Sequence, residues 1–255
     1  MTWDPSQYLR FADQRRRPAV DLLARIATDN PARVTDLGCG AGNVTKLLAQ
    51  RWPNAKVVGI DSSAAMLDKA RGEAPAIEWR QDDLATWKAD QPVDVLYSNA
   101  ALHWIDNHRA VFPRLIEALA PGGTLAVQMP RNHGAVSHTG MAAAARSGPW
   151  RSRLEPVLRE HPVQTPDVYY DILAGAGAKP DIWEVEYLQQ LEGENAVVEW
   201  TKGTALKPLL DALDEPWRSQ FLADYTARMN AAYPRRADGI TLFPFRRLFI
   251  VATRG

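Results

Sequence analysis

The chain has 255 residues, of which 46% are hydrophobic, and this is enough for one large domain or two small ones with a substantial core. Lys+Arg and Asp+Glu both number 30, so the formal net charge of +0 gives no reason to expect a nucleic-acid partner. The single cysteine, Cys39, cannot form an intrachain disulfide, which fits a reducing compartment.

The first residues carry charge before any apolar stretch, which is not the order of a signal peptide. Charge or proline interrupts every longer apolar run well short of the roughly 18 residues that a membrane-spanning helix requires. We therefore expect a soluble cytoplasmic protein that does not bind a membrane. The sequence predicts no oligomeric state and no metal site.

Residues 6–27 have helical apolar spacing, and Pro18 is expected to start the second of two helices. From Arg33 onward, short apolar runs alternate with helical stretches. The runs predict strands at residues 34–37, 56–60, 77–80, 93–98 and 124–129, with helices at 44–51, 64–72 and 108–120, the last of which is expected to end at Pro121-Gly122-Gly123.

The C-terminal part is less regular. Residues 131–165 contain a short Ala-rich helix, 167–174 form a helix that ends at Gly175, and 197–233 have helical spacing, while 182–188 and 245–253 are expected to be strands. Regular alternation of strands and helices implies a parallel sheet covered on both faces. We therefore predict an α/β fold with a doubly wound, mainly parallel seven-stranded sheet and a helical cover.

The first chemical motif is a strand that runs into three alternating glycines, Gly38, Gly40 and Gly42, with Asp36 before them. Glycines in such a turn allow a sharp bend and a close approach of a ligand to the main chain. A nicotinamide dehydrogenase would show Gly-x-Gly-x-x-Gly instead. The spacing and Asp36 resemble the first motif of the Class I S-adenosylmethionine-dependent methyltransferases. The resemblance implies a Rossmann-like fold and S-adenosylmethionine as the cofactor, released as S-adenosylhomocysteine.

Asp61, followed by Ser62, ends the next predicted strand, where a carboxylate can accept both hydroxyl hydrogens of a ribose. NAD enzymes use an acid in the same place, so Asp61 indicates a ribose more firmly than it identifies the cofactor. Its alternative is a helix N-cap or a turn acid. Met66, one helical turn later, would cover an adenine face or fill the core.

Asp82, Asp83 and Leu84 follow the third predicted strand. In the methyltransferase family an acid here receives the adenine amino group, and the next backbone amide meets a ring nitrogen. Asp83 followed by Leu84 is the better match, and Asp82 takes this role if the strand slips by one residue. The alternative is that the two acids cap a short turn.

The fourth predicted strand ends in Ser98-Asn99, and Asn99 is expected to face the cofactor's methionine end through its backbone carbonyl. The Asn-Pro-Pro-Tyr or Asp-Pro-Pro-Tyr motif of many base or amide N-methyltransferases is absent, which argues against an exocyclic amine as acceptor. His103 and Trp104 would lie at the mouth of the acceptor pocket. Trp104 is a candidate pocket wall or an ordinary half-buried aromatic, and His103 is a packing residue more readily than a base.

Residues 8–18, 198–204 and 242–251 resemble one branch of the family, the trans-aconitate 2-methyltransferases. This resemblance implies carboxyl O-methylation of trans-aconitate or a related small polycarboxylate to its monomethyl ester. Arg15, Arg17, Arg246 and Arg247 are candidate anchors because arginine binds carboxylates bidentately, and Tyr8 belongs to the same predicted substrate site. The alternative is a solvated basic face for Arg15 to Arg17 and, on the last predicted strand, one arginine that points inward and one that points outward. The sequence leaves open which arginines bind and which carboxylate is methylated.

A carboxylate acceptor is ionised at neutral pH, so we predict no catalytic residue beyond those that position the reactants. Residues 1–255 are expected to form a single domain, with 33–130 as the cofactor-binding core, 1–30 as an N-terminal helical cover, and 131–165 and 196–235 as insertions that cover the substrate. Three alternatives remain: another small-molecule O, N or C acceptor, a non-catalytic S-adenosylmethionine-binding protein, and a nucleotide-linked oxidoreductase, which the glycine spacing disfavours.

Overall fold

The computed structural model describes residues 12–159 and 161–255, with side chains from residue 16 onward. The chain divides into two compact units. The sheet unit comprises residues 16–130, 162–185 and 247–255, and the helical unit comprises the described residues of 12–15, 131–161 and 186–246. The prediction that the chain acts as a single domain, with the insertions covering the substrate, stays a prediction.

One seven-stranded sheet has the order β3-β2-β1-β4-β5-β7-β6. Its strands are β1 (Arg33–Leu37), β2 (Lys56–Asp61), β3 (Glu78–Gln81), β4 (Val93–Asn99), β5 (Leu119–Pro130), β6 (Ala178–Glu192) and β7 (Ile240–Arg254). Strands β1 to β5 pair in parallel, and β7 is antiparallel to β5. The predicted doubly wound, mainly parallel sheet is therefore confirmed.

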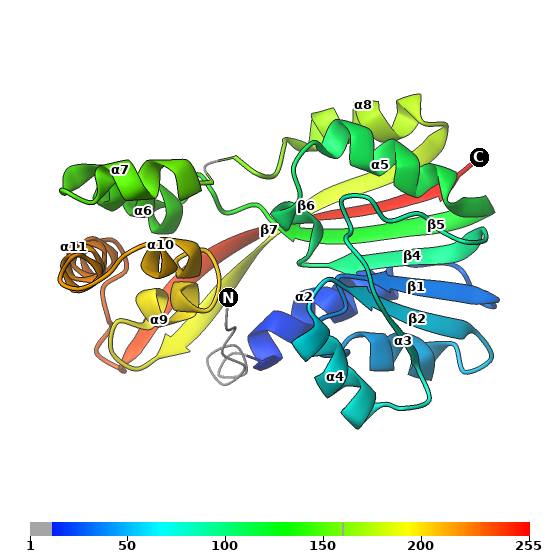
Figure 1. The fold of residues 1–255 in the computed structure, drawn as a ribbon, viewed down its shortest axis with the longest axis horizontal. Coiled ribbons are helices and arrows are strands. Elements are labelled where there is room, and N and C mark those ends of the chain that lie inside the picture. Colours follow the sequence, from blue (N-terminus) through cyan, green and yellow to red (C-terminus); the bar gives the residue numbers. More distant parts are fainter. Residues whose placement is uncertain (1–11, 160) are drawn as a thin grey trace. The chain divides into compact units, whose positions relative to one another are not determined.

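Helices cover both faces of the sheet unit (Figure 1). Helices α2 (Ala12–Ala24), α3 (Thr45–Arg51) and α4 (Ala64–Glu73) lie on one face, and α5 (His108–Glu117) and α8 (Pro166–Gly175) lie on the other (Figure 1). Because β-α-β connections are right-handed, the chain changes face when the strand order reverses after β3. The central strands are consequently apolar on both sides, and Val95, Leu96, Leu125 and Val127 are fully buried.

The strand order reverses between β1 and β4, which pair directly. In doubly wound sheets the helices diverge at this point and leave a crevice beyond the carboxyl ends of the strands, where ligands bind. The glycine-rich turn follows β1, whereas β2 ends at Asp61, just before Ser62, and β4 ends at Asn99, just before Ala100. The fold thus brings the predicted cofactor motifs to one edge of one sheet.

The helical unit contains α6 (Val136–Ser147), α7 (Arg151–Leu154), α9 (Ala196–Lys202), α10 (Lys207–Asp211) and α11 (Trp217–Ala232), together with parts of β6 and β7. Helix α6 packs against α11. This unit has its own apolar core, which includes Trp150, Trp200, Phe221 and Phe243.

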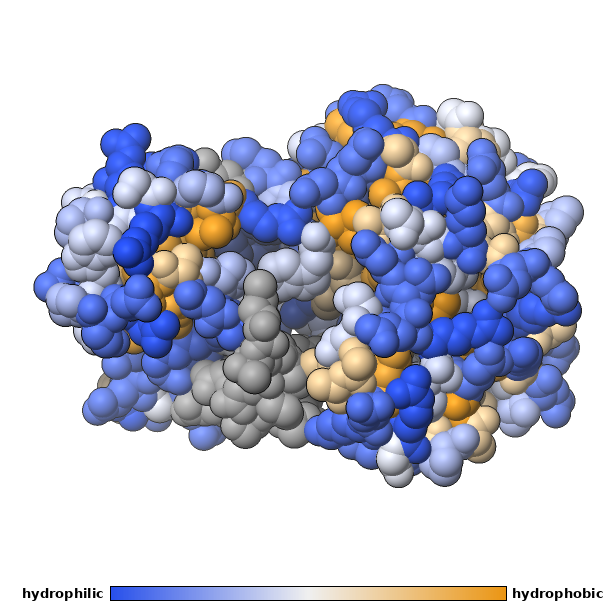
Figure 2. All heavy atoms as spheres, viewed as in Figure 1, coloured by the Kyte–Doolittle hydropathy of each residue, from blue (hydrophilic) through white to orange (hydrophobic). Residues whose placement is uncertain are grey.

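Hydrophilic and hydrophobic residues are interspersed on the face of the sheet unit that Figure 2 shows. Scattered apolar residues are normal on a protein surface. Among residues 12–159 and 161–255, no helix is both long and apolar enough to cross a membrane.

Two sequence predictions about helix boundaries are wrong. Pro18 lies inside α2 instead of starting a helix, because burial of Ala19, Leu22 and Leu23 on the sheet side holds the helix despite the missing N–H. Helix α5 ends at Glu117, and Pro121-Gly122-Gly123 belongs to β5. The pairing of β4 with β5 shifts register between Val93 and Val95, so this segment forms an irregularity in a strand and does not end a helix.

Candidate functional site

The turn after β1 requires glycine for two separate reasons. Gly38 and Gly40 have φ angles of +78° and +54°, a region that other residues rarely adopt. A Cβ atom on Gly38 would lie 2.1 Å from the Cβ of Ala101, which follows β4. The turn after β1 and the segment after β4 therefore approach each other so closely that a side chain at position 38 would clash with Ala101.

Asp61 links the end of β2 to this turn. Its Oδ2 accepts a hydrogen bond from the Gly40 amide at 2.8 Å, and its Oδ1 accepts one from the Ser63 amide at 2.9 Å. Ser63 is the N-cap of α4, since its side chain accepts from the Met66 amide. Each carboxylate oxygen has a second acceptor position, so a half-buried Asp61 is able to accept two further hydrogen bonds. Ser62, which lies between Asp61 and Ser63 in the chain, is exposed.

Asp36 is buried within β1 and does not reach solvent. The hydroxyl of Thr45, at the start of α3, donates to Asp36 Oδ2 at 2.6 Å. Burial raises the pKa of Asp36 to about 7; the Thr45 hydrogen bond opposes this shift and the charge of Asp61 adds to it. The contact joins the two ends of the glycine-rich turn, because Asp36 precedes it and Thr45 follows it.

The segment after β3 lies near the glycine-rich turn. Leu84 Cδ1 is 3.3 Å from the position that a Cβ on Gly38 would take. Asp83 is exposed, and its Oδ1 accepts from the Ala85 amide at 2.9 Å, while Asp82 Oδ1 accepts from the Asp83 amide at 2.7 Å. Both acids thus stabilise a turn, and the choice between them at an adenine stays open.

Asn99 is half-buried at the end of β4, and its Oδ1 is shielded from solvent without a hydrogen-bond partner among the described residues. A short 3-10 helix, Leu102–Trp104, follows. The rings of His103 and Trp104 are 4.8 Å apart, and Trp104 is 45% exposed. An exposed indole next to the carboxyl end of a central strand is available to contact a ligand.

The three candidate arginines whose side chains the structure describes have different surroundings. Arg17 is exposed, with its Nε 3.9 Å from Asp21, and Arg246, in the helical unit, is 3.6 Å from Glu186 and 49% exposed. Arg247, in the sheet unit, is 5% exposed and donates from Nη1 to Gln128 Oε1 at 3.3 Å. Tyr8 and the side chain of Arg15 lie outside the described residues.

Sequence reasoning missed two residues, Thr45 and Gln128. Gln128 is fully buried in β5, in the run Leu-Ala-Val-Gln-Met from 125 to 129. A lone amide in an apolar strand was a signal, since buried polar groups require partners. Thr45 had no comparable signal, because a threonine at the start of a helix is common.

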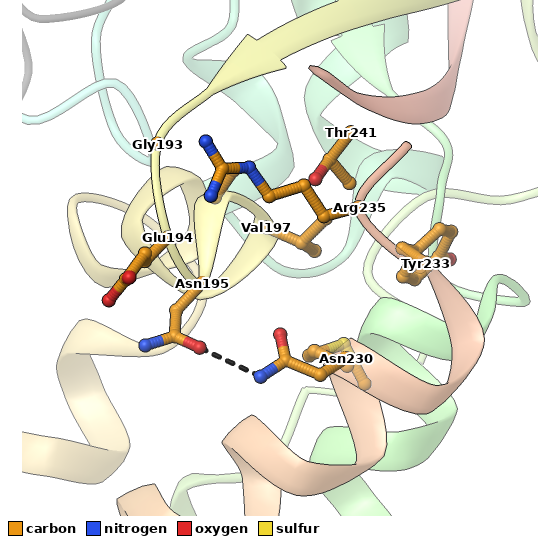
Figure 3. Close-up of a pocket in the computed structure, with 10 residues that line it drawn as sticks. Gly193, Glu194, Asn195, Val197, Asn230, Tyr233, Arg235 and Thr241 are labelled. Atoms are coloured by element: carbon orange, nitrogen blue, oxygen red, sulfur yellow. Dashed lines mark hydrogen bonds between the residues drawn. The ribbon is translucent and has the colours of Figure 1, made fainter. Parts of the chain in front are cut away.

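The helical unit contains a separate cavity of about 450 Å³. It lies between the start of α9, the end of α11 and the residues that lead into β7, and Figure 3 shows Asn195 and Asn230 facing each other across a 2.8 Å hydrogen bond. None of the residues predicted for cofactor or acceptor is among the ten that line it. The cavity is therefore distinct from the predicted site.

Known proteins resemble the chain over its core and over its full length. A family described as "Methyltransferase domain" matches residues 34–123. A trans-aconitate 2-methyltransferase from Azoarcus sp. (strain BH72) is 48% identical over 253 residues, which cover 99% of both chains. One from Streptomyces coelicolor is 48% identical over 264 residues, covering 99% of this chain and 87% of the relative.

The fold is also that of a solved S-adenosylmethionine-dependent methyltransferase from Mesorhizobium loti, with a TM-score of 0.57 at 20% identity, covering 96% of this chain and all of that one. The glycine-rich turn, the acid after β2 and the sheet order agree with the full-length similarity. The chain belongs to the trans-aconitate 2-methyltransferase family of Class I methyltransferases.

Proposed function

We propose that the protein transfers a methyl group from S-adenosylmethionine to a carboxylate oxygen of trans-aconitate or a closely related small polycarboxylic acid. The observation that best supports S-adenosylmethionine as the cofactor is the hydrogen bond from the Gly40 amide to Asp61, beside the switch point of the sheet. The choice of substrate is supported by the relatives named trans-aconitate 2-methyltransferase, which match the chain at 48% identity over 99% of its length.

The residues at the carboxyl ends of β1 and β2 fit an adenosine group. Gly38 and Gly40 allow a ligand to approach the main chain, and Asp61 holds two acceptor positions for ribose hydroxyls, with Ser62 beside it. Asp36 supports this turn through Thr45. Adenine then meets Met66 on one side and Asp83-Leu84 at its edge, with Asp82 as the alternative acid.

The end of β4 fits the methionine part of the cofactor. Asn99 offers its backbone carbonyl and a shielded side-chain oxygen, Oδ1, to an ammonium donor. When bound, S-adenosylmethionine supplies a methyl group on a sulfonium and leaves as S-adenosylhomocysteine. This edge of the sheet therefore offers groups that suit both the adenosine and the methionine part of the cofactor.

The acceptor needs orientation more than activation. A carboxylate with an ordinary pKa of about 4 is ionised at neutral pH, so it attacks the methyl carbon with its own lone pair and gives up no proton. Arginine side chains hold the nonreacting carboxylates, and Arg247 is the first candidate for this role. The remaining candidates for the acceptor site are Tyr8, Arg15, Arg17 and Arg246. His103 and Trp104 form the wall near the reacting group. In this mechanism no side chain acts as a base. The rate acceleration comes from holding the carboxylate oxygen in line with the methyl group of the cofactor.

The test is methyl transfer from labelled S-adenosylmethionine to trans-aconitate, cis-aconitate, citrate and isocitrate, with the ester identified by mass spectrometry. We expect a monomethyl ester of trans-aconitate as the main product. Binding of S-adenosylhomocysteine without transfer to any acid would instead identify a binding protein. Transfer only to a hydroxyl or amine in a wider metabolite panel would identify a different acceptor.

A further inference from the structure

Three polar side chains lie together at the carboxyl ends of β4 and β5 in an otherwise apolar part of the sheet unit. Asn99 of β4 pairs with Gln128 of β5, and Gln128 pairs in turn with Phe249 of β7. Arg247 stands two residues before Phe249, so alternation along the strand places its side chain on the same face as Gln128. The 3.3 Å contact between Arg247 Nη1 and Gln128 Oε1 agrees with this register.

The contact with Arg247 determines which way the Gln128 amide points. A guanidinium donates hydrogen bonds and cannot accept them, so the amide oxygen must face Arg247. The amide nitrogen, Nε2, is then the atom of this amide that does not contact Arg247. It is buried and has no hydrogen-bond partner among the described residues.

Burial makes this arrangement costly unless a ligand completes it. Gln128 is 0% exposed and Arg247 is 5% exposed. A buried donor without a partner loses its hydrogen bonds to water and gains none in return, and native structures rarely retain one without a reason. An apolar residue would fill the same space in β5 without this cost, as Val127 and Met129 do on either side.

We infer that Gln128 is a specificity-determining residue that donates from Nε2 to one oxygen of an ionised carboxylate while Arg247 donates to the other. A carboxylate fits because it only accepts hydrogen bonds, and both groups that face it donate them. Gln128 would also hold the guanidinium in place through Oε1, so one side chain orients the cation and adds a donor.

A carboxylate at this position has two sources, the acceptor acid and the methionine end of the cofactor. The acceptor source rests on the proposed function, whereas the cofactor source does not. The proximity of Asn99, whose shielded oxygen suits an ammonium group, is compatible with the second source. Separate measurements of acceptor KM and of the Kd for S-adenosylhomocysteine distinguish the two.

The decisive variant is Gln128→Glu. This variant keeps the length of the side chain and gives Arg247 a stronger acceptor. It removes the Nε2 donor, however, and adds a negative charge that repels a carboxylate. We expect at least a tenfold rise either in the KM for trans-aconitate or in the Kd for S-adenosylhomocysteine, in a protein with an unchanged circular dichroism spectrum. If neither constant changes, the inference is overturned; the double-mutant cycle below decides whether a rise reflects direct contact or only the positioning of Arg247. Met129→Leu, at the next position of β5, is the matched control and should change neither.

A double-mutant cycle separates direct contact from positioning, and it also covers the case in which Gln128→Glu does not fold. Arg247→Met alone is compared with Arg247→Met plus Gln128→Met, an apolar pair suited to a buried site. Direct contact with the carboxylate predicts a further rise of several-fold in the same constant, and a positioning role predicts none. If the wild type methylates no acid, the proposed function fails, but calorimetry with S-adenosylhomocysteine and with trans-aconitate still decides the role of Gln128.

Discussion

Asp61 is the residue through which the cofactor site is tested most directly. Asp61→Ala removes an acceptor whose hydrogen bonds to ribose hydroxyls are worth about 1.5–3 kcal/mol, so we expect the Kd for S-adenosylmethionine to rise more than tenfold. Isothermal titration calorimetry measures the change. Asp61→Asn keeps one oxygen for the Gly40 amide and should lose less. If the folded Asp61→Ala variant binds S-adenosylmethionine with unchanged affinity, Asp61 does not contact the ribose and only stabilises the turn.

Asp36 makes the stability of the ligand-free protein depend on pH. Its pKa rises from an ordinary 3.8 to about 7, so between these values the folded protein keeps a proton that the unfolded chain has lost. Stability from this group is therefore present at low pH and falls as pH rises toward 7, by up to about 1.4 kcal/mol per pH unit.

Asp36→Asn removes this titration and keeps the shape of the side chain. We expect the variant to gain free energy of unfolding relative to the wild type as pH rises from 4 to 8, measured by urea denaturation at intervals of one pH unit. A constant difference across the range would show that Asp36 is ionised throughout.

His103 tests the chemistry at the acceptor. Because an ionised carboxylate surrenders no proton, His103→Ala should retain turnover within about tenfold of the wild type. General-base catalysis typically contributes about 10²–10⁴, so a loss greater than a hundredfold in kcat with unchanged KM would point to a hydroxyl acceptor. Steady-state kinetics with trans-aconitate provide the comparison.

At the scale of elements, the turn between β1 and α3 depends on the space around it as well as on its backbone angles. Gly38 and Gly122 have φ angles of +78° and +74°, so alanine at either position pays for a left-handed conformation, about 1–2 kcal/mol. Only Gly38 has a close neighbour, since nothing lies within 4 Å of a Cβ on Gly122.

We therefore expect Gly38→Ala to lower the free energy of unfolding by at least about 2 kcal/mol more than Gly122→Ala, because overpacking adds to the backbone cost. Cofactor affinity should fall only for Gly38→Ala. Urea denaturation and calorimetry on both variants test this. Equal effects would mean that the segment after β4 moves aside without cost.

The strands illustrate which elements local sequence predicts well. All seven predicted strands exist, and their ends differ from those observed mostly by a few residues, because each is a short apolar run between turn residues. Pro18 and Pro121-Gly122-Gly123 misled the prediction because their usual effect is to start or end helices. In α2, the burial of apolar side chains keeps the helix intact across Pro18. In β5, Pro121-Gly122-Gly123 lies where the pairing with β4 shifts register.

At the scale of the whole molecule, the predicted cofactor motifs lie far apart in sequence and meet at one edge of the sheet. Asp61 reaches Gly40 across 21 positions, and Ala101 comes up against Gly38. This was predictable because parallel strands place their carboxyl ends together, so residues after successive strands must be neighbours. The four arginines obeyed no such rule, and only Arg247 is buried among those that the structure describes.

The sequence by itself determined the class of fold, the glycine-rich turn, the acid after β2 and the family. Those features depend on residues close together in the chain or on the order of strands, which hydrophobic periodicity reveals. Alternation along the last predicted strand allowed one of Arg246 and Arg247 to point inward, but only the tertiary structure decided that Arg246 faces solvent and that Arg247 meets Gln128, 119 positions away. The direction of a side chain on the last strand follows from its register with β5, and packing of the complete sheet sets that register.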